Sequence, residues 1–453
     1  MGTAKDRPSL RGRQSAQPDG TEDDSATKEP HRPVPGIEEV EPEDVGVSSA
    51  YLANIDRLQQ RYLAENAYQG SVVLVARHGK VCYFRAFGKA DEVDGEVVPM
   101  ATDSVFRLAS MSKVVAAVAV LQLFEQGRIA LHEPISTYLP EFANPKVAVV
   151  KDWQVTQLAS ADREITIHDL LTMTAGMTNT WWYRMFEPPV YGVVPQLYKD
   201  AGLMDDLNAP PITLQENMEI LASLPLIAQP GTMFDYSNNS VDTLCRLVEV
   251  VSELDFDSYL REHIFNPLGM NETWFFPPAS VRERIAAVYW AGRDEKQVGA
   301  SPLGHGNLGP DYTFSEHQSY FSGAGGLHGT TADYFRFAQM LLNRGELDGV
   351  RVLSPSSVRL MTSNQIGEKR NWQLTQNKWG YMVDIQEGVN APAGSIHYLG
   401  GPGAYSWQGF FSTKFVNNPA QDTVILTMST PGFDGALPHN LRLVAAAAAA
   451  VVD

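Results

Sequence analysis

The chain has 453 residues, of which 44% are hydrophobic, 10% aromatic and 19% charged, which excludes a disordered, collagen-like or coiled-coil protein. The formal net charge of -18 argues against nucleic acid or an anionic membrane as a partner. No apolar run reaches the length of a membrane span, the polar N-terminus has no secretory signal, and Cys82 and Cys245 stand alone, so we expect a cytoplasmic protein with reduced cysteines.

The first part of the chain predicts a disordered arm followed by a folded domain. Residues 1–45 are rich in charged residues, Pro, Ser and Gly and have almost no large apolar side chain, whereas residues 46–453 predict one folded domain. Apolar residues at helical spacing after Ser48 and Ser49, either of which can cap a helix, predict a helix there. The β-rich runs 71–77 and 80–86 flank His78 and Gly79, which predicts a hairpin with a two-residue turn.

Residues 136–320 change to helical patterns and long loops, and the last part returns to strands. A capped helix is expected at 166–173, and amphipathic helices at 241–254 and 258–265. Strands are expected at 405–416 and 423–429, before an Ala-rich helix that begins near Leu441. The fold class is therefore α+β: an antiparallel sheet built from N- and C-terminal parts, flanked by helices, with an inserted, mostly helical lobe.

Several common kinds of catalytic site find no support in the sequence. The ten histidines form no metal-binding spacing, and there is no phosphate loop and no G-x-S-x-G nucleophile elbow. The glycine-rich stretches 323–326 and 400–403 match no dinucleotide fingerprint and are better explained as tight turns. We expect neither a metal nor a cofactor.

Ser110 and Lys113 form an S-x-x-K motif at the start of an intensely apolar helix. The motif alone is weak, because Ser25 and Lys28 also satisfy it inside the predicted arm. Three residues apart on a helix, Ser110 and Lys113 lie on the same face. The partial positive charge at the N-terminus of this helix favours an oxyanion. Apolar surroundings would lower the pKa of Lys113 enough for its amine to accept a proton. The alternative is a capping serine followed by a surface lysine.

A second element, Tyr236, Ser237 and Asn238, decides between these interpretations. With it, the chain resembles the serine β-lactamase and penicillin-binding-protein superfamily, in which S-x-x-K opens a buried helix and Y-x-N lies on a loop of the helical lobe. Further stretches at 106–109, 165–177, 266–270 and 323–333 match that family in the right order. The resemblance runs from about residue 50 to the end and implies a β-lactamase/transpeptidase-like fold.

The resemblance implies a role for each site residue. Ser110 would be the nucleophile, Lys113 and Tyr236 the proton relay, and Asn238 would orient Lys113. The third family motif is K-T-G in lactamases and W-G-G in the related family VIII carboxylesterases, to which this chain is most similar. Trp407, Gln408 and Gly409 take that place, with residues 399–401 as a competing alignment that the following proline disfavours. Gln408 departs from the family pattern, which leaves the substrate shape at this strand open.

The same resemblance implies an oxyanion hole formed by the backbone N–H groups of Ser110 and Phe410, with Gly409 allowing close approach of the acyl group. We expect a small-molecule carboxylic ester as substrate. An acyltransferase, a β-lactamase or D-amino-acid peptidase, and a non-catalytic scaffold are the alternatives. The aromatic stretch 178–191 would either line an acyl pocket or form a lid on the helical lobe. The sequence leaves the natural ester and the oligomeric state open.

Overall fold

The computed structural model describes residues 37–180, 189–203, 212–289, 319–387, 401–431 and 436–453. Its centre is an eight-stranded antiparallel sheet in the order β11-β12-β13-β14-β15-β1-β2-β3. The N- and C-terminal parts of the chain meet in this sheet, where β1 pairs with β15 from Ser71 opposite Ser429 to Arg77 opposite Thr423. The predicted fold class is therefore confirmed.

The strands of the large sheet are β1 (Gly70–Arg77), β2 (Lys80–Val93), β3 (Glu96–Pro99), β11 (Lys378–Trp379), β12 (Asp384–Ile385), β13 (Tyr405–Gln408), β14 (Lys414–Asn418) and β15 (Thr423–Ser429). Smaller sheets use β4 (Val105–Arg107), β5 (Lys146–Lys151), β6 (Gln154–Ser160), β7 (Thr273–Trp274), β8 (His328–Thr330), β9 (Glu346–Leu347) and β10 (Val350–Arg351). The α-helices are α1 (Ser49–Ala64), α2 (Ser112–Glu125), α3 (Ile167–Leu171), α4 (Pro189–Asp200), α5 (Leu214–Ala222), α6 (Asn238–Ser252), α7 (Phe256–Leu260), α8 (Asn266–Leu268), α9 (Thr331–Leu342), α10 (Pro355–Met361) and α11 (Ala436–Ala449).

Local sequence signals account for the elements at the N-terminal side. Ser48 caps α1 by accepting a hydrogen bond from the backbone N–H of Tyr51. His78 and Gly79 both have positive φ values, 54° and 76°, as the tight turn between β1 and β2 requires. The predicted helix and hairpin are thus found where the sequence places them.

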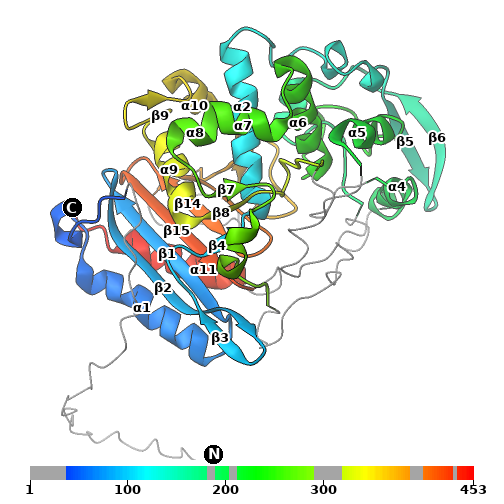
Figure 1. Ribbon diagram of the computed structural model, residues 1–453. Coiled ribbons are helices and arrows are strands. Elements are labelled where there is room, and N and C mark those ends of the chain that lie inside the picture. The colour runs from blue at the N-terminus through cyan, green and yellow to red at the C-terminus, as the bar shows by residue number, and fades with distance from the viewer. Residues whose placement is uncertain (1–36, 181–188, 204–211, 290–318, 388–400, 432–435) are drawn as a thin grey trace, which may run out of the picture.

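Helices cover both faces of the sheet, which explains why every residue of β1 is buried. Val73 and Val75 pack with Leu443 and Val444 of α11 and with α1, on the outer face. Val72 and Leu74 belong to the larger core on the inner face, which includes α2 and α9. Figure 1 shows α2, in cyan, between the sheet and the helical lobe that carries α5 and α6.

Three expectations need correction. The ordered domain begins before residue 46, because η1 (Pro42–Val45) and a backbone hydrogen bond of 2.9 Å from Val40 to Val81 attach residues 40–45 to the domain. The run 405–416 is two strands, β13 and β14, since the chain turns between them with Ser412 at a φ of 62°. The helical lobe also contains the β5–β6 hairpin, which pairs from Lys146 to Ser160.

The described part of the chain settles two further points. Cys82 and Cys245 are both buried and free. No helix in the described ranges is both long enough and apolar enough to cross a membrane. The cytoplasmic location stays a prediction.

Candidate active site

Ser110 lies in η2 (Ala109–Met111), a single 3-10 turn that leads directly into α2. Its side chain is partly exposed, whereas Ala109 and Met111 on either side are buried. Ala109 has a φ of 46°, a backbone conformation that costs a non-glycine residue about 1–3 kcal/mol and that clusters at functional sites. The packed surroundings of Ala109 therefore hold Ser110 in a fixed, partly exposed position at the start of α2.

Lys113 is completely buried, with 0% of its surface exposed. Its Nζ donates hydrogen bonds to Ser110 Oγ at 3.1 Å, to Asn238 Oδ1 at 2.8 Å and to the carbonyl oxygen of Ala324. Burial lowers the pKa of Lys113 to about 7, while Asp242 and Cys245 act in the opposite direction. Burial therefore makes the free amine, which could accept a proton from Ser110, accessible near neutral pH. The interpretation of Lys113 as a surface lysine is wrong.

Tyr236 lies on the loop before α6 and completes the cluster around the serine. Burial raises the pKa of Tyr236, and hydrogen bonds with the Ser110 and Trp407 side chains lower it. The Trp407 indole N–H donates to the Tyr236 hydroxyl at 3.2 Å, and the Lys113 Nζ lies 5.0 Å from the centre of the Tyr236 ring. The hydroxyl is therefore protonated at neutral pH and placed to exchange a proton with Ser110.

Trp407 fixes the Tyr236 ring through packing as well as through its indole N–H. The two ring centroids are 5.3 Å apart, and the ring of Trp379 lies 4.5 Å from that of Trp407 and 6.2 Å from that of Tyr236. All three side chains are buried. This aromatic cluster leaves the Tyr236 ring little freedom to rotate away from Ser110.

Asn238 begins α6 and connects Lys113 to the tyrosine loop. Its side-chain oxygen accepts from Lys113, and its backbone N–H donates to Asn179 Oδ1 at 2.7 Å. Asn179 in turn donates from Nδ2 to the carbonyl oxygen of Tyr236 at 2.8 Å. The buried Asn179 side chain thus bonds to the backbones of both Tyr236 and Asn238, which fixes the spacing of their side chains.

Gly409 brings the end of β13 against the turn that precedes the serine. A Cβ at this position would lie 2.4 Å from the carbonyl oxygen of Leu108 and 2.1 Å from Thr413 Oγ1. Thr413 Oγ1 also donates to the Leu108 carbonyl at 3.1 Å. The structure thus gives Gly409 a packing reason, close approach to Leu108, in addition to the predicted approach of an acyl group.

Phe410 follows Gly409 and packs against the small apolar cluster of Ala109, Val288 and Phe411. The residue is partly exposed. The structure therefore brings Phe410 beside the turn that carries Ser110. The oxyanion hole formed by their backbone N–H groups stays a prediction.

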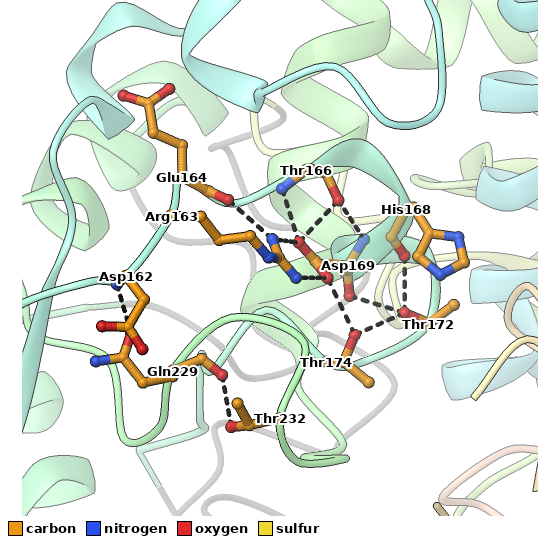
Figure 2. A network of polar contacts seen from close by, with 10 residues as sticks. All are labelled: Asp162, Arg163, Glu164, Thr166, His168, Asp169, Thr172, Thr174, Gln229 and Thr232. Atoms are coloured by element: carbon orange, nitrogen blue, oxygen red, sulfur yellow. Dashed lines mark hydrogen bonds and ion pairs between the residues drawn. The ribbon is translucent and has the colours of Figure 1, made fainter. Parts of the chain in front are cut away.

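A network of polar contacts supports the loop that carries Tyr236 (Figure 2). Asp169 accepts two hydrogen bonds from the Arg163 guanidinium and also accepts from the backbone N–H and hydroxyl of Thr166. Although burial opposes ionisation, these contacts hold the pKa of Asp169 below its usual value. In Figure 2 the Gln229 side chain reaches Asp162, where its Oε1 accepts from the backbone N–H at 2.8 Å.

Backbone hydrogen bonds extend this support to the tyrosine. Gly231 N–H donates to the Thr174 carbonyl at 2.7 Å, and Asp235 N–H donates to the Met173 carbonyl at 2.8 Å. Gln373 accepts from the backbone N–H of Tyr236 at 2.6 Å. The backbone that leads into the tyrosine is therefore held on both sides.

Sequence reasoning missed four contributors to the site: Asn179, Asp242, Gln373 and the carbonyl of Ala324. The glycine-rich stretch around Ala324 matched the family, but nothing in the sequence showed that this carbonyl would accept from Lys113. The aromatic residues 181–188 lie outside the described residues, so the choice between an acyl pocket and a lid stays open. Within the described ranges, no group of three or more His, Cys, Asp or Glu side chains is placed to hold a metal.

The antiparallel sheet with its inserted lobe, and the serine, lysine and tyrosine gathered at the start of the central helix, define a serine hydrolase of the β-lactamase fold. The family comparison gives the same result. The model of the beta-lactamase family matches residues 55–449, and the chain belongs to that family.

The chain is similar in sequence or structure to three named proteins. Protein Rv1367c of Mycobacterium tuberculosis (strain ATCC 25618 / H37Rv) is 32% identical over 366 residues, which cover 79% of this chain and 84% of that protein. Esterase EstB of Burkholderia gladioli is 29% identical over 399 residues, covering 86% and 92%. The structure of EstCE1, described as a hydrolase with promiscuous acyltransferase activity, aligns with a TM-score of 0.72 and 25% identity, covering 89% of this chain and 99% of that one.

Proposed function

We propose that this protein hydrolyses small carboxylic esters through an acyl-enzyme on Ser110. The observation that carries the proposal is the hydrogen bond between Ser110 and a buried Lys113 whose pKa burial lowers to about 7. The amine takes the hydroxyl proton as Ser110 attacks the ester carbonyl. The Tyr236 hydroxyl gives its proton to the leaving alkoxide and regains one from the Lys113 ammonium, so that both residues return to their starting state. Water then attacks the acyl-enzyme by the reverse of this path.

The negative charge that develops on the carbonyl oxygen requires donors that are in place before the reaction. The backbone N–H groups of Ser110 and Phe410 are the donors we propose for this oxyanion hole. The contact of Gly409 with Leu108 supports this assignment, because it fixes β13 relative to the serine turn.

Trp407 supports an ester rather than a β-lactam or a peptide C-terminus as substrate. The K-T-G motif of lactamases provides a cation that attracts a substrate carboxylate, and Trp407 stands at that position here. Its indole N–H is already donated to Tyr236, and its ring is buried. A neutral ester loses no binding energy by this replacement, whereas an anionic substrate loses a charge pair. The similarity to esterase EstB agrees with this preference.

The test is a comparison of kcat/KM for p-nitrophenyl esters of graded chain length with that for a chromogenic cephalosporin. Ser110→Ala serves as the matched inactive control. We expect at least one short-chain ester to exceed the cephalosporin by 100-fold or more, on the order of what one lost charge-assisted contact removes. A higher kcat/KM for the cephalosporin than for every ester would overturn the proposal in favour of a lactamase.

Acyl transfer is the second candidate, favoured by the similarity to EstCE1. An alcohol can take the place of water in attacking the same acyl-enzyme. Product analysis with a primary alcohol added to the ester assay separates the two: a new ester as the main product indicates a transferase, and free acid indicates a hydrolase.

A further inference from the structure

Asp242 is a buried carboxylate close to the catalytic lysine to which the mechanism above gives no part. It lies on α6 one helical turn after Asn238, so the two side chains project from the same face of the helix. Only 1% of the Asp242 surface is exposed. A buried carboxylate needs several hydrogen-bond donors to offset the loss of its hydration.

Three hydrogen-bond donors surround the carboxylate, and two of them, Ser322 and Ala324, lie in one turn. The Tyr320 hydroxyl donates to Asp242 Oδ2 at 2.9 Å, the Ser322 hydroxyl to Oδ1 at 2.9 Å, and the backbone N–H of Ala324 to Oδ1 at 3.1 Å. The carboxylate thus fixes the turn formed by residues 322–326, the lysine-contacting turn. Gly323 lets this turn lie close to α6, because a Cβ there would be 2.3 Å from Cys245 Sγ.

Ala324 connects the carboxylate to the lysine. Its backbone N–H donates to Asp242 while its carbonyl oxygen accepts from Lys113 Nζ. The position of one acceptor for the catalytic amine is therefore set by a carboxylate on another element. In the described part of the chain the two charged groups interact through this residue and not through a direct ion pair.

From this connection we infer that Asp242 is a positioning residue for Lys113, holding the lysine-contacting turn and stabilising the ammonium that forms when Lys113 takes the proton of Ser110. The inference rests on the proposed acyl-enzyme function. Without the carboxylate, the turn would lose its common acceptor and the ammonium would lose its nearby negative charge.

The charged and titratable groups around Lys113 agree with this role. Ser110 lies just before α2, the helix that carries Lys113, and Tyr236 lies on the loop before α6. Asp242 and Cys245 lie on α6, and Tyr320 precedes the lysine-contacting turn. Of these groups, Asp242 and Cys245 raise the pKa of Lys113, against the larger effect of burial, and Asp242 has the larger effect of the two. Burial raises the pKa of Asp242 itself to about 6, while its hydrogen-bond donors and Lys113 favour the ionised carboxylate.

The experiment measures the rate at which a fluorophosphonate labels Ser110 as a function of pH, since labelling needs the free amine of Lys113 but no deacylation. For the wild type the rate should rise through about pH 7 as Lys113 loses its proton. Asp242→Asn removes the charge and lowers the pKa of Lys113, so the rise should move to lower pH by about one unit. The maximal rate should fall at least tenfold, because the turn is less well held.

A double variant separates the charge from the hydrogen bonds. Asn217 Nδ2 donates to the Tyr320 hydroxyl at 2.7 Å, so exchanging the two residues as Asn217→Asp with Asp242→Asn keeps a donor–acceptor chain through Tyr320 in reversed direction. The negative charge then lies one hydroxyl further from Lys113. We expect the maximal rate to recover at least in part and the rise to stay at lower pH.

The possible outcomes distinguish the two proposals. A purely structural role would lower the rate at every pH and leave the pH of the rise unchanged, which overturns the inference. If Asp242→Asn reacts at the same rate and with the same pH dependence as the wild type, the inference alone is overturned. If the folded wild type never reacts with the fluorophosphonate, the proposed function is overturned and the inference with it. If Asp242→Asn does not fold, Ser322→Ala decides, because it removes one donor to the carboxylate and so makes it less ionised. Slower labelling together with a rise at lower pH supports the inference, and an unchanged pH of the rise contradicts it.

Discussion

Lys113 and Lys414 are both buried almost completely, and they differ in what surrounds them. Lys113 has 0% of its surface exposed and Lys414 has 1%. The acceptors that Lys113 Nζ contacts directly are neutral, one of them a serine hydroxyl, and Asp242 is linked to it through the Ala324 backbone. Lys414 lies on β14 opposite Gln408, so it is on the sheet face opposite to Trp407, and Asp384 acts on it as a counter-charge.

The two sites differ in the groups that lie next to the lysine amine. Burial lowers the pKa of both lysines, and a carboxylate opposes that effect in each case, Asp242 for Lys113 and Asp384 for Lys414. Asp384 itself accepts from Thr375 Oγ1 at 2.5 Å and from Asn377 Nδ2 at 2.7 Å. Asp384 is the counter-charge that acts on Lys414, whereas Lys113 contacts the hydroxyl of Ser110, the nucleophile of the proposed mechanism. Burial alone therefore does not identify a catalytic lysine.

The largest expected effect comes from exchanging each lysine for methionine. Lys113→Met should lower kcat for ester hydrolysis by about 10³-fold or more, since the proton acceptor is gone, while the melting temperature stays level or rises. Lys414→Met should leave kcat per folded protein unchanged and lower stability by about 3–5 kcal/mol, because Asp384 loses its counter-charge. Ester kinetics and denaturant unfolding of the two variants provide the measurements.

A double variant tests whether the unpaired charge of Asp384 causes the loss of stability in Lys414→Met. Adding Asp384→Asn to Lys414→Met removes the second charge and should restore part of the lost stability. If Lys414→Met abolished turnover in folded protein while Lys113→Met did not, the assignment of the two lysines would be reversed.

Tyr236→Phe should come next, with a loss in kcat of about 10²–10³-fold and no change in folding, because the ring and its aromatic contacts remain. Since Lys113 and Tyr236 share one proton path, the double variant with Lys113→Met should be little slower than the slower single variant. Losses that multiply in the steady-state rates would show that the two residues act independently.

Gly409→Ala tests the contact that fixes β13 against the serine turn. The added Cβ cannot fit beside Leu108, so the strand must move, and we expect a loss in kcat of about 10²-fold with a destabilisation of about 1–3 kcal/mol. Gly401→Asn is the matched control, because no atom lies within 4 Å of a Cβ there and asparagine tolerates its φ of 88° better than other residues. Equal losses in the two variants would favour the competing motif at 399–401.

Trp407→Phe should have the smallest effect, a decrease in kcat of roughly tenfold, the value of one hydrogen bond. The phenyl ring keeps the packing against Trp379 but cannot donate to the Tyr236 hydroxyl. A pH–rate profile unchanged from the wild type, together with full activity, would show that this hydrogen bond contributes nothing to the proton relay.

The sequence predicted the elements of the fold that depend on local patterns, and the resemblance predicted the central residues of the site. The cap at Ser48 and the turn at His78 and Gly79 follow from the properties of those residues, and the resemblance pointed to Ser110, Lys113 and Tyr236, which the structure brings together. The assigned roles of the site residues stay predictions.

The contacts that support the site could not be predicted, because they join residues far apart in the chain. Asp242 and Ser322 are 80 positions apart, and Asn179 and Tyr236 are 57 apart. No local periodicity marks such pairs, since they form only when the lobe packs around α2. The β5–β6 hairpin was missed for another reason: its strands lie inside a region with helical patterns.

The most direct test of the central claim is intact-protein mass spectrometry after reaction with a fluorophosphonate, followed by peptide mapping. We predict the addition of one phosphonyl group to the wild type, located on Ser110, no addition to Ser110→Ala, and normal labelling of Ser25→Ala, which changes the other S-x-x-K match. A label on any other residue, or equal labelling of Ser110→Ala, would contradict the assignment of Ser110 as the nucleophile.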